Sequence, residues 1–211
     1  MKFIFLTMLM LISPLTLSAD AFNIKTSAEQ VSPLLPGLTV PNSQVLNPQG
    51  NVISTDSVFA KKPTVLVVYR GGWCPFCSRQ LMGIQQITSE LEELGLQVVA
   101  ISPEKPSVLK TSQDDKSYQL LSDSDLSFSQ KMGLAFYLDD KTAQIYRDKL
   151  GVNFVGFDEK TQVALPVPAV FLIDTRAMVH FQYTNPNYKV RLSNDVLLSA
   201  ARQMIKDSQA L

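Results

Sequence analysis

Hydrophobic residues along the chain follow two patterns, one typical of buried strands and the other of amphipathic helices. Residues 64–69 form a continuous run of apolar and β-branched residues, which predicts a strand that is buried on both faces. Residues 96–101 predict a second strand of the same kind. Between the two runs, apolar residues recur at steps of three or four, which predicts one helix that ends at Gly95. These apolar positions are Leu81, Ile84, Ile87, Leu91 and Leu94.

Similar patterns predict the other elements. Short strands are expected at 38–46 and 52–53, on either side of a turn at 47–51, and at 118–121. Helices are expected at 103–112, 123–132, 139–150 (ending at Gly151) and 193–209. Residues 169–173 and 178–183 predict an antiparallel strand pair, because only a short turn separates them. Strands that alternate with helices predict an α/β fold with a central mixed β-sheet, helices on both faces and a short N-terminal β extension.

The first residues of the chain have the composition of a secretory signal peptide. Lys2 precedes a short apolar run at 3–12, and small residues follow in the sequence Ala19-Asp20-Ala21. The run is shorter than the roughly 20 residues that span a bilayer, although an uncleaved membrane anchor is the alternative. We therefore expect residues 1–21 to be removed and residues 22–211 to form one domain. The mature protein would then be exported, in a bacterium to the periplasm, where disulfides persist.

Composition and charge exclude several classes of function. Hydrophobic residues make up 45% of the chain, so it is expected to fold rather than to remain disordered. The chain has 19 basic and 19 acidic residues and no basic run, so we expect no nucleic-acid partner. Two cysteines and one histidine exclude a Cys₄ or Cys₂His₂ zinc site and a scaffold of several disulfides. We expect no metal and no cofactor.

The two cysteines form the most informative pattern in the chain. Cys74 and Cys77 directly follow a predicted buried strand, and Pro75 between them suits the first position of a helix. Cys74 would then lie at the helix N-terminus, where unpaired N–H groups and the helix dipole stabilise a thiolate. Cys77 would lie one turn further along, able to attack a mixed disulfide or a sulfenic acid at Cys74. A disulfide that closes so short a loop stabilises a fold poorly, which favours a redox role.

Three neighbours of the cysteines are candidates for supporting roles. Arg70 could add a positive field near the thiolates, although such a residue could also be simply solvated. Gly71 and Gly72 allow close approach of another part of the backbone. Trp73 would pack beside the cysteines and offer apolar surface for a docking partner.

The string Tyr69-Arg-Gly-Gly-Trp-Cys-Pro-Phe-Cys77 resembles the active site of the thioredoxin superfamily, and in particular the peroxiredoxin-like branch of the alkyl hydroperoxide reductase/thiol-specific antioxidant family. Similar segments are Val99-Ala-Ile-Ser-Pro-Glu104, Leu120-Leu-Ser-Asp123, Leu165-Pro-Val-Pro-Ala-Val-Phe-Leu-Ile-Asp174 and Tyr188-Lys-Val-Arg191. The resemblance extends from about Val31 to the C-terminus. It implies a thioredoxin-like fold, a thiol-dependent oxidoreductase and a cis-proline at Pro168 that faces the cysteines.

The chain departs from the peroxiredoxin pattern at the residues that handle peroxide. By the resemblance, Cys77 takes the position of the attacking cysteine, and Cys74 stands where a Thr or Ser is typical. Arg70 replaces the usual Pro, and the usual later Arg aligns with Pro168. Arg70 or Arg191 could supply the missing guanidinium. The strand before Trp73 also lacks the carboxylate that assists proton transfer in thioredoxins.

Three functions follow from these observations. The first is an extracytoplasmic thiol–disulfide oxidoreductase that acts on disulfide-bonded proteins, with Cys74 as exposed nucleophile and Cys77 as resolving thiol. The second is a thiol peroxidase in which Cys77 attacks hydrogen peroxide or an organic hydroperoxide. Both would need a thiol reductant delivered across the membrane. The third is a copper-binding module that uses both thiolates and His180. The sequence shows no interface from which an oligomeric state follows.

Five further polar residues are weaker candidates. Glu104 follows a predicted strand and is interpreted as a carboxylate at a helix start. Asp123 and Asp125 are interpreted as helix caps. Tyr188 and Arg191 lie in a polar loop after the last strand, where they could shape the active site.

Overall fold

A computed structural model describes residues 24–114, 116–150 and 163–209 of the 211-residue chain. The predicted signal peptide at 1–21 and the expected helix end at Gly151 lie outside the described residues. Within them, no helix is long and apolar enough to cross a membrane.

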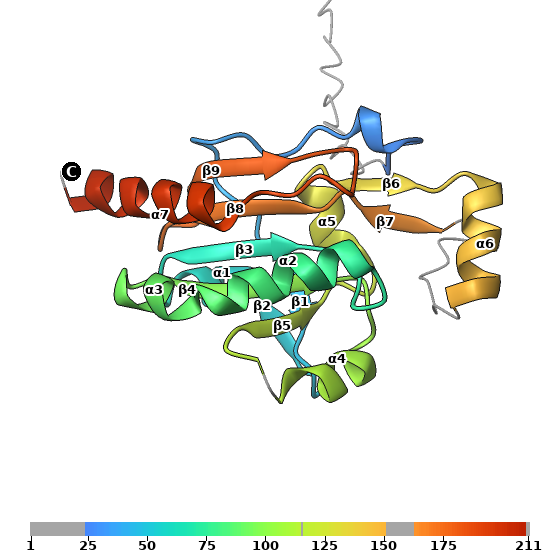
Figure 1. Ribbon diagram of the computed structural model, residues 1–211, viewed down its shortest axis with the longest axis horizontal. Helices are drawn as coiled ribbons and strands as arrows, with labels where there is room; N and C mark the ends of the chain where they lie inside the picture. Colours follow the sequence, from blue (N-terminus) through green and yellow to red (C-terminus); the bar gives the residue numbers. More distant parts are fainter. Residues whose placement is uncertain (1–23, 115, 151–162, 210–211) are drawn as a thin grey trace, which may run out of the picture.

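A seven-stranded mixed sheet forms the centre of the described chain, in the order β2-β1-β5-β4-β3-β8-β9 (Figure 1). The strands are β1 Gln44–Leu46, β2 Val52–Ser54, β3 Thr64–Val68, β4 Gln97–Ser102, β5 Gln119–Ser122, β8 Ala169–Ile173 and β9 Val179–Thr184. Strands β3, β4 and β5 are parallel, whereas β8 runs antiparallel to both β3 and β9. The predicted mixed sheet and the antiparallel strand pair are therefore confirmed.

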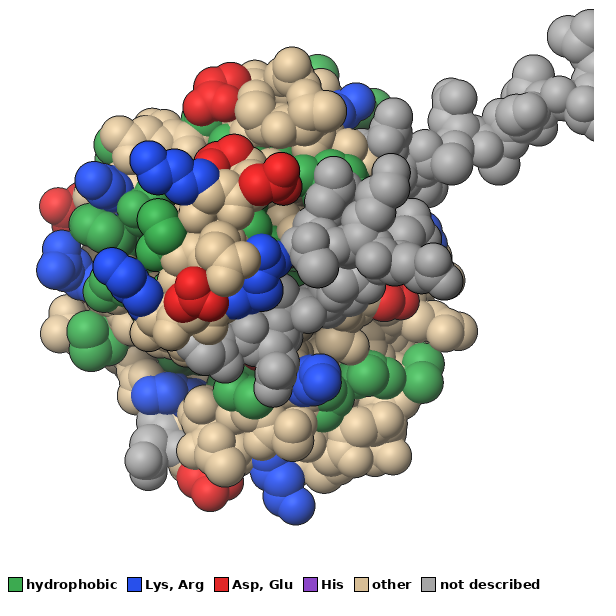
Figure 2. Space-filling model, turned by 90° about the vertical axis from the view of Figure 1, so that its right-hand side faces the viewer, with side chains coloured by type: hydrophobic (Ala, Val, Ile, Leu, Met, Phe, Trp, Pro, Cys, Tyr) green, Lys and Arg blue, Asp and Glu red, His purple; other side chains and the backbone are tan. Residues whose placement is uncertain are grey.

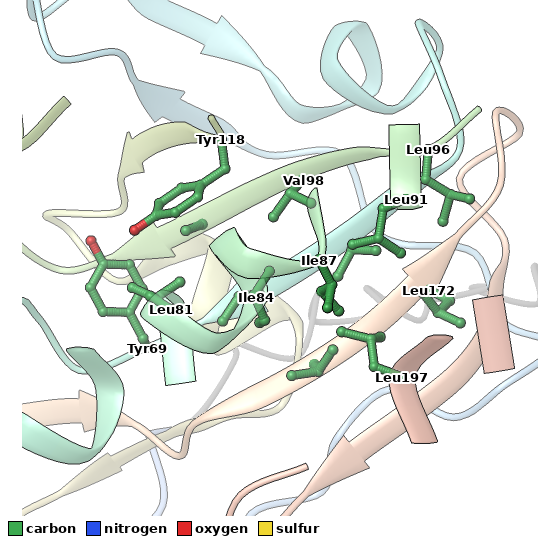
Figure 3. Close-up of a cluster of buried hydrophobic side chains, with 14 of the residues drawn as sticks. Tyr69, Leu81, Ile84, Ile87, Leu91, Leu96, Val98, Tyr118, Leu172 and Leu197 are labelled. Carbon is green, nitrogen blue, oxygen red and sulfur yellow. The ribbon is translucent and has the colours of Figure 1, made fainter. Parts of the chain in front are cut away.

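Helices cover both faces of this sheet, as predicted. They are α1 Thr55–Phe59, α2 Pro75–Gln86, α3 Thr88–Glu93, α4 Pro106–Gln113, α5 Ser127–Lys131 and α7 Asn194–Gln209. A further helix, α6 Asp140–Leu150, lies at one end of the molecule (Figure 1). Side chains of β3 alternate between two buried clusters because successive strand residues point to opposite faces. Val65 and Val67 pack against residues of α2, α3, α4 and α7, whereas Leu66 and Val68 pack against α1 and α5. Figure 3 shows part of the first cluster.

The predicted helix between β3 and β4 is broken into α2 and α3. Ile87 separates them with φ −107° and ψ 8°, outside the helical region. Its N–H bonds the Ile84 carbonyl in a tighter turn, and the Thr88 hydroxyl donates to that same carbonyl at 3.1 Å. The apolar stripe still reaches one cluster, since Leu81, Ile84, Ile87 and Leu91 all belong to it (Figure 3). The spacing of the apolar residues therefore predicts which side chains are buried, but it does not predict the break in the helix.

The helix predicted at 123–132 is shortened to α5. Leu126 has a φ of +57°, so residues 123–126 form a turn rather than a helix. The buried Asp123 carboxylate accepts hydrogen bonds from the N–H groups of Phe128 and Ser129, at 2.9 and 2.8 Å. Asp125 accepts one from the N–H of Ser127. Both aspartates thus bind the first N–H groups of the helix, in agreement with the cap interpretation.

A small second sheet, which the sequence pattern did not predict, extends the molecule at one end. Strand β6, Ala135–Tyr137, pairs with β7, Ala164–Pro166, and α6 lies next to them (Figure 1). The short 3-10 helix η1, Ala28–Gln30, contacts β6. On the face shown in Figure 2, acidic, basic and hydrophobic side chains are interspersed.

Candidate active site

The two cysteines lie where β3 ends and α2 begins. Cys74 is the residue before the helix, with φ −86° and ψ 111°, and Pro75 is the first helical residue, as predicted. The N–H of Cys74 donates to the Gly71 carbonyl at 3.1 Å, and its own carbonyl accepts the first helical bond, from Ser78 at 3.0 Å. The loop thus holds Cys74 at the helix N-terminus, with Cys77 one turn further along.

Side chains, rather than another part of the backbone, lie close to the two glycines: the Trp73 indole at Gly71 and the Glu104 carboxylate at both. Gly71 has a φ of +140°, and a Cβ there would collide with the Trp73 indole. The N–H of Gly72 donates to Glu104 Oε2 at 3.0 Å, and the Ser102 hydroxyl lies 3.3 Å from the same oxygen. Burial raises the pKa of Glu104. Glu104 therefore fastens the loop that carries the cysteines to the end of β4.

Both thiols are free and buried in this reduced structure. Cys74 is 1% exposed and Cys77 is fully buried, and both belong to the apolar cluster under α2. The expectation that Cys74 is an exposed nucleophile is therefore wrong for this state. The physical reason is that Trp73 and Phe76, which flank it, pack against the same cluster and cover it.

The two thiols titrate as one unit, and their pKa values move in opposite directions. The pKa of Cys74 is lowered to about 6, first because Cys77 donates a hydrogen bond to the Cys74 thiolate. Burial opposes this shift, whereas the charges of Arg70 and Arg191 add to it. The pKa of Cys77 is raised, because it keeps the shared proton and because it is buried. At neutral pH the pair therefore carries one negative charge.

Arg191 supplies a guanidinium to the pair from the other end of the chain. Its Nη2 donates to Cys77 Sγ at 3.3 Å, across 114 positions of sequence. Asn185 and Asn187 shape the loop that carries it, since each accepts an N–H two residues ahead, at 2.9 and 3.2 Å. Within the described chain Arg191 has no carboxylate partner, and its Nε is buried without an acceptor. Among the described residues, the Cys77 sulfur is the hydrogen-bond acceptor of this guanidinium.

Arg70 is buried rather than solvated, and aromatic rings surround it. Its side chain is 3% exposed, and the guanidinium carbon lies 4.5 Å from the centre of the Tyr188 ring. The rings of Trp73 and Tyr146 are each 5.3 Å away, and Nη2 donates to the Tyr146 hydroxyl at 3.0 Å. Tyr188 in turn packs its edge against Phe76. The ring faces attract the cation and keep it near the thiols.

Trp73 is half-buried and packs inside the protein. Its ring contacts Tyr146 edge-on, with ring centres 5.5 Å apart, and it joins two apolar clusters. It therefore forms part of the enclosure of Arg70, which differs from the apolar docking surface that the sequence suggested.

The cis-proline expectation is not met. No peptide bond in the described chain is cis, so Val167–Pro168 is trans. Val167 and Pro168 join β7 directly to β8, and the N–H of Val167 donates to the Leu134 carbonyl at 2.9 Å. The chain thus continues from one strand into the next without a turn, which suits the usual trans form. Pro168 nevertheless lines the same cavity as Arg70.

The copper hypothesis is not supported by the geometry. His180 lies at the start of β9 and bonds Asp174 at 3.2 Å. Strand register places that pair beside the first residue of β3, whereas the cysteines follow its last residue. The strand of five residues separates them by roughly 15 Å. Among the described residues no three His, Cys, Asp or Glu side chains converge on a metal site.

Comparison with known proteins shows the family to which the chain belongs. A family model described as the AhpC/TSA family matches residues 36–182. The putative peroxiredoxin bcp of Haemophilus influenzae is 33% identical over 106 residues, which are 49% of this chain and 68% of the relative. The chain belongs to the AhpC/TSA family. The resemblance seen in the sequence is therefore confirmed, and this member of the family is a thiol-dependent oxidoreductase, as predicted.

Solved structures confirm the predicted thioredoxin-like fold. Reduced Prx3 from Vibrio vulnificus, crystallised in complex with H₂O₂, has a TM-score of 0.63 at 21% identity, over 80% of this chain and 99% of that one. Peroxidoxin BcpB from Mycobacterium tuberculosis has a TM-score of 0.59 at 18% identity, over 80% and 97% of the two chains. Likeness at this level of identity shows the fold alone.

The titration of the thiol pair gives a direct test. We expect thiolate absorbance of the reduced protein to rise as the pH passes through about 6. Cys77→Ala removes the donor that contributes most to the low pKa of Cys74, so this pKa should rise. Cys77→Ser keeps a hydroxyl donor of similar size and should preserve most of the shift. If the pKa of Cys74 in Cys77→Ala were as low as in the unaltered protein, this result would contradict a proton shared between the two thiols.

Proposed function

We propose that the chain is a peroxiredoxin-type thiol peroxidase in which Cys77 attacks the peroxide and Cys74 resolves the product. The observation that carries this proposal is the contact of the Arg191 guanidinium with Cys77 Sγ. A guanidinium at the attacking sulfur can hold a peroxide oxygen and stabilise the charge that develops as the O–O bond breaks. Membership of the AhpC/TSA family supports the same chemistry.

The reaction is a two-electron oxidation of the thiol pair. The shared proton moves to Cys74, and the Cys77 thiolate attacks one oxygen of the hydroperoxide while the O–O bond breaks. The alkoxide or hydroxide that leaves takes up the proton from the Cys74 thiol, which becomes a thiolate again, and Cys77 becomes a sulfenic acid. The Cys74 thiolate then attacks the sulfenic sulfur, forms the disulfide and releases hydroxide, which is protonated to water. An external thiol must reduce the disulfide.

Burial of the sulfurs supports a small substrate. Attack on a protein disulfide requires that a sulfur atom be reached by another folded chain. Neither Cys74 nor Cys77 offers such a surface in the reduced structure. Hydrogen peroxide, or the end of an organic hydroperoxide, needs far less space. The supporting roles of Arg70 and Trp73 are part of the proposal: Arg70 stabilises the thiolate, and Trp73 encloses Arg70.

A second candidate, a thiol–disulfide oxidoreductase, is favoured by one observation. The lowered pKa of Cys74 is what the attacking cysteine of a Cys-x-x-Cys enzyme requires. In that reaction Cys74 would form a mixed disulfide with the substrate and Cys77 would release it. The Cys74 sulfur would first have to become exposed, because it is buried in the reduced state.

Single-turnover oxidation separates the two candidates. Reduced Cys74→Ser protein mixed with hydrogen peroxide should form a stable sulfenic acid at Cys77, because the resolving thiol is missing. Cys77→Ser protein should react no faster than free cysteine at the same pH. A reagent that traps sulfenic acids, followed by peptide mass spectrometry, identifies the modified residue. The reverse pattern, with sulfenic acid at Cys74 only, would overturn the assignment and favour the oxidoreductase.

We also propose that the protein is exported and that its reductant is delivered across the membrane. The support is the composition of residues 1–21. N-terminal sequencing of the protein isolated from the periplasm of a bacterial host should begin near Asp20 or Phe22. Protein that remains in the cytoplasm with an intact Met1 would contradict export.

A further inference from the structure

A cavity of about 470 Å³ opens beside the cysteine pair, on the side of Arg70. Segments that are distant in the sequence form it: the end of β3, strand β6, helix α6 and the loop after β9. Its main lining residues are Arg70, Phe136, Tyr146, Pro168, Tyr188 and Lys189. Its volume lies in the range of about 300–1,000 Å³ that is usual for small-molecule sites. Neither sulfur lines it, so it differs from the place where peroxide must react.

The positive charge at this cavity has no carboxylate partner within the described chain. Arg70 is 3% exposed, and no described acidic side chain pairs with it. Its Nε is buried without an acceptor, and its Nη2 donates to a hydroxyl, that of Tyr146, rather than to a carboxylate. A guanidinium removed from water without a carboxylate is costly, and ring faces offset only part of that cost. An anion bound in the cavity would complete the pairing.

Other lining residues define the kind of anion. Lys189 adds a second positive charge at the exposed rim, and the exposed Glu29 opposes it, so the three charged lining residues sum to one positive charge. Phe136, Leu138, Val167, Pro168 and Pro186 give the cavity apolar walls. One excess positive charge and apolar walls suit a singly charged anion with an apolar body. A planar carboxylate also matches the geometry of a guanidinium.

We propose that this cavity is a binding site for small carboxylates with an apolar body, whose carboxylate pairs with Arg70. Binding at this site does not depend on the peroxidase reaction. It does affect the thiol pair, because Arg70 is one of the charges that stabilise the Cys74 thiolate. A bound carboxylate would neutralise that charge. The thiol pair would then ionise less readily when the cavity is occupied.

The test compares octanoate with octanamide on the reduced full-length protein. Both probes have the same apolar chain, and only octanoate is charged. Trp73 is the only tryptophan in the chain and lies against Arg70, so its fluorescence should report occupancy. We expect octanoate to bind with saturation and octanamide to bind at least about tenfold more weakly, as the loss of a hydrogen bond to a charged group implies. Thiolate absorbance should show a higher pKa of the thiol pair with octanoate bound.

Variants locate the site. Lys189→Gln should weaken octanoate binding roughly two- to fivefold, the usual effect of an exposed charge pair. The matched control is Lys141→Gln, which removes an exposed lysine on α6 that does not line the cavity, and it should leave binding unchanged. Arg70→Met should abolish the preference for octanoate over octanamide.

Several outcomes would overturn the proposal: equal binding of the two probes, absence of saturable octanoate binding, or an unchanged preference in Arg70→Met. If Arg70→Met does not fold, the comparison of the two probes on the unaltered protein still decides. A protein that fails as a peroxidase but binds octanoate in this manner refutes the proposed function and leaves the binding site intact.

Discussion

One negative charge, shared by two buried thiols, is the constraint on which this site depends. Buried charge is tolerated only where other groups compensate it. Here the first compensation is internal, since Cys77 donates its proton to the Cys74 thiolate. The second comes from Arg70 and Arg191, neither of which has a carboxylate partner in the described chain. Because no carboxylate competes for them, both guanidinium groups remain available to the sulfur atoms and to a substrate oxygen.

The fold brings the residues of the site together from four separate parts of the sequence. Strand β3 and the start of α2 hold Arg70 and the cysteines, and Glu104 fastens their loop to the end of β4. The loop after β9 returns Arg191 to Cys77 and Tyr188 to Arg70. Helix α6 contributes Tyr146. Arg70 therefore links the proposed peroxide chemistry to the proposed carboxylate site, since its charge stabilises the Cys74 thiolate and its side chain lines the cavity.

Much of this arrangement could be predicted from the sequence, and the failures have identifiable causes. The buried strands and the position of Cys74 before a helix follow from local patterns. The break at Ile87 could not be predicted, because it depends on a Thr88 hydroxyl that competes for a backbone carbonyl. Strands β6 and β7 have three residues each, too few for a periodic pattern. The partner of Cys77 was identified only as one of two arginines, because Arg191 reaches it through tertiary structure.

The central claim is that the Arg191 guanidinium makes Cys77 reactive towards peroxide, and the rate of oxidation of the reduced protein tests it most directly. Stopped-flow Trp73 fluorescence after mixing with hydrogen peroxide should be followed for the unaltered protein, Arg191→Gln and Arg202→Gln. Arg202 lies on the surface, where it pairs with Glu90, and serves as the matched control. We expect Arg191→Gln to react about 100-fold more slowly, the usual effect of losing a donor at a developing charge. Arg202→Gln should react normally. An Arg191→Gln protein that is oxidised as fast as the unaltered one would contradict the claim.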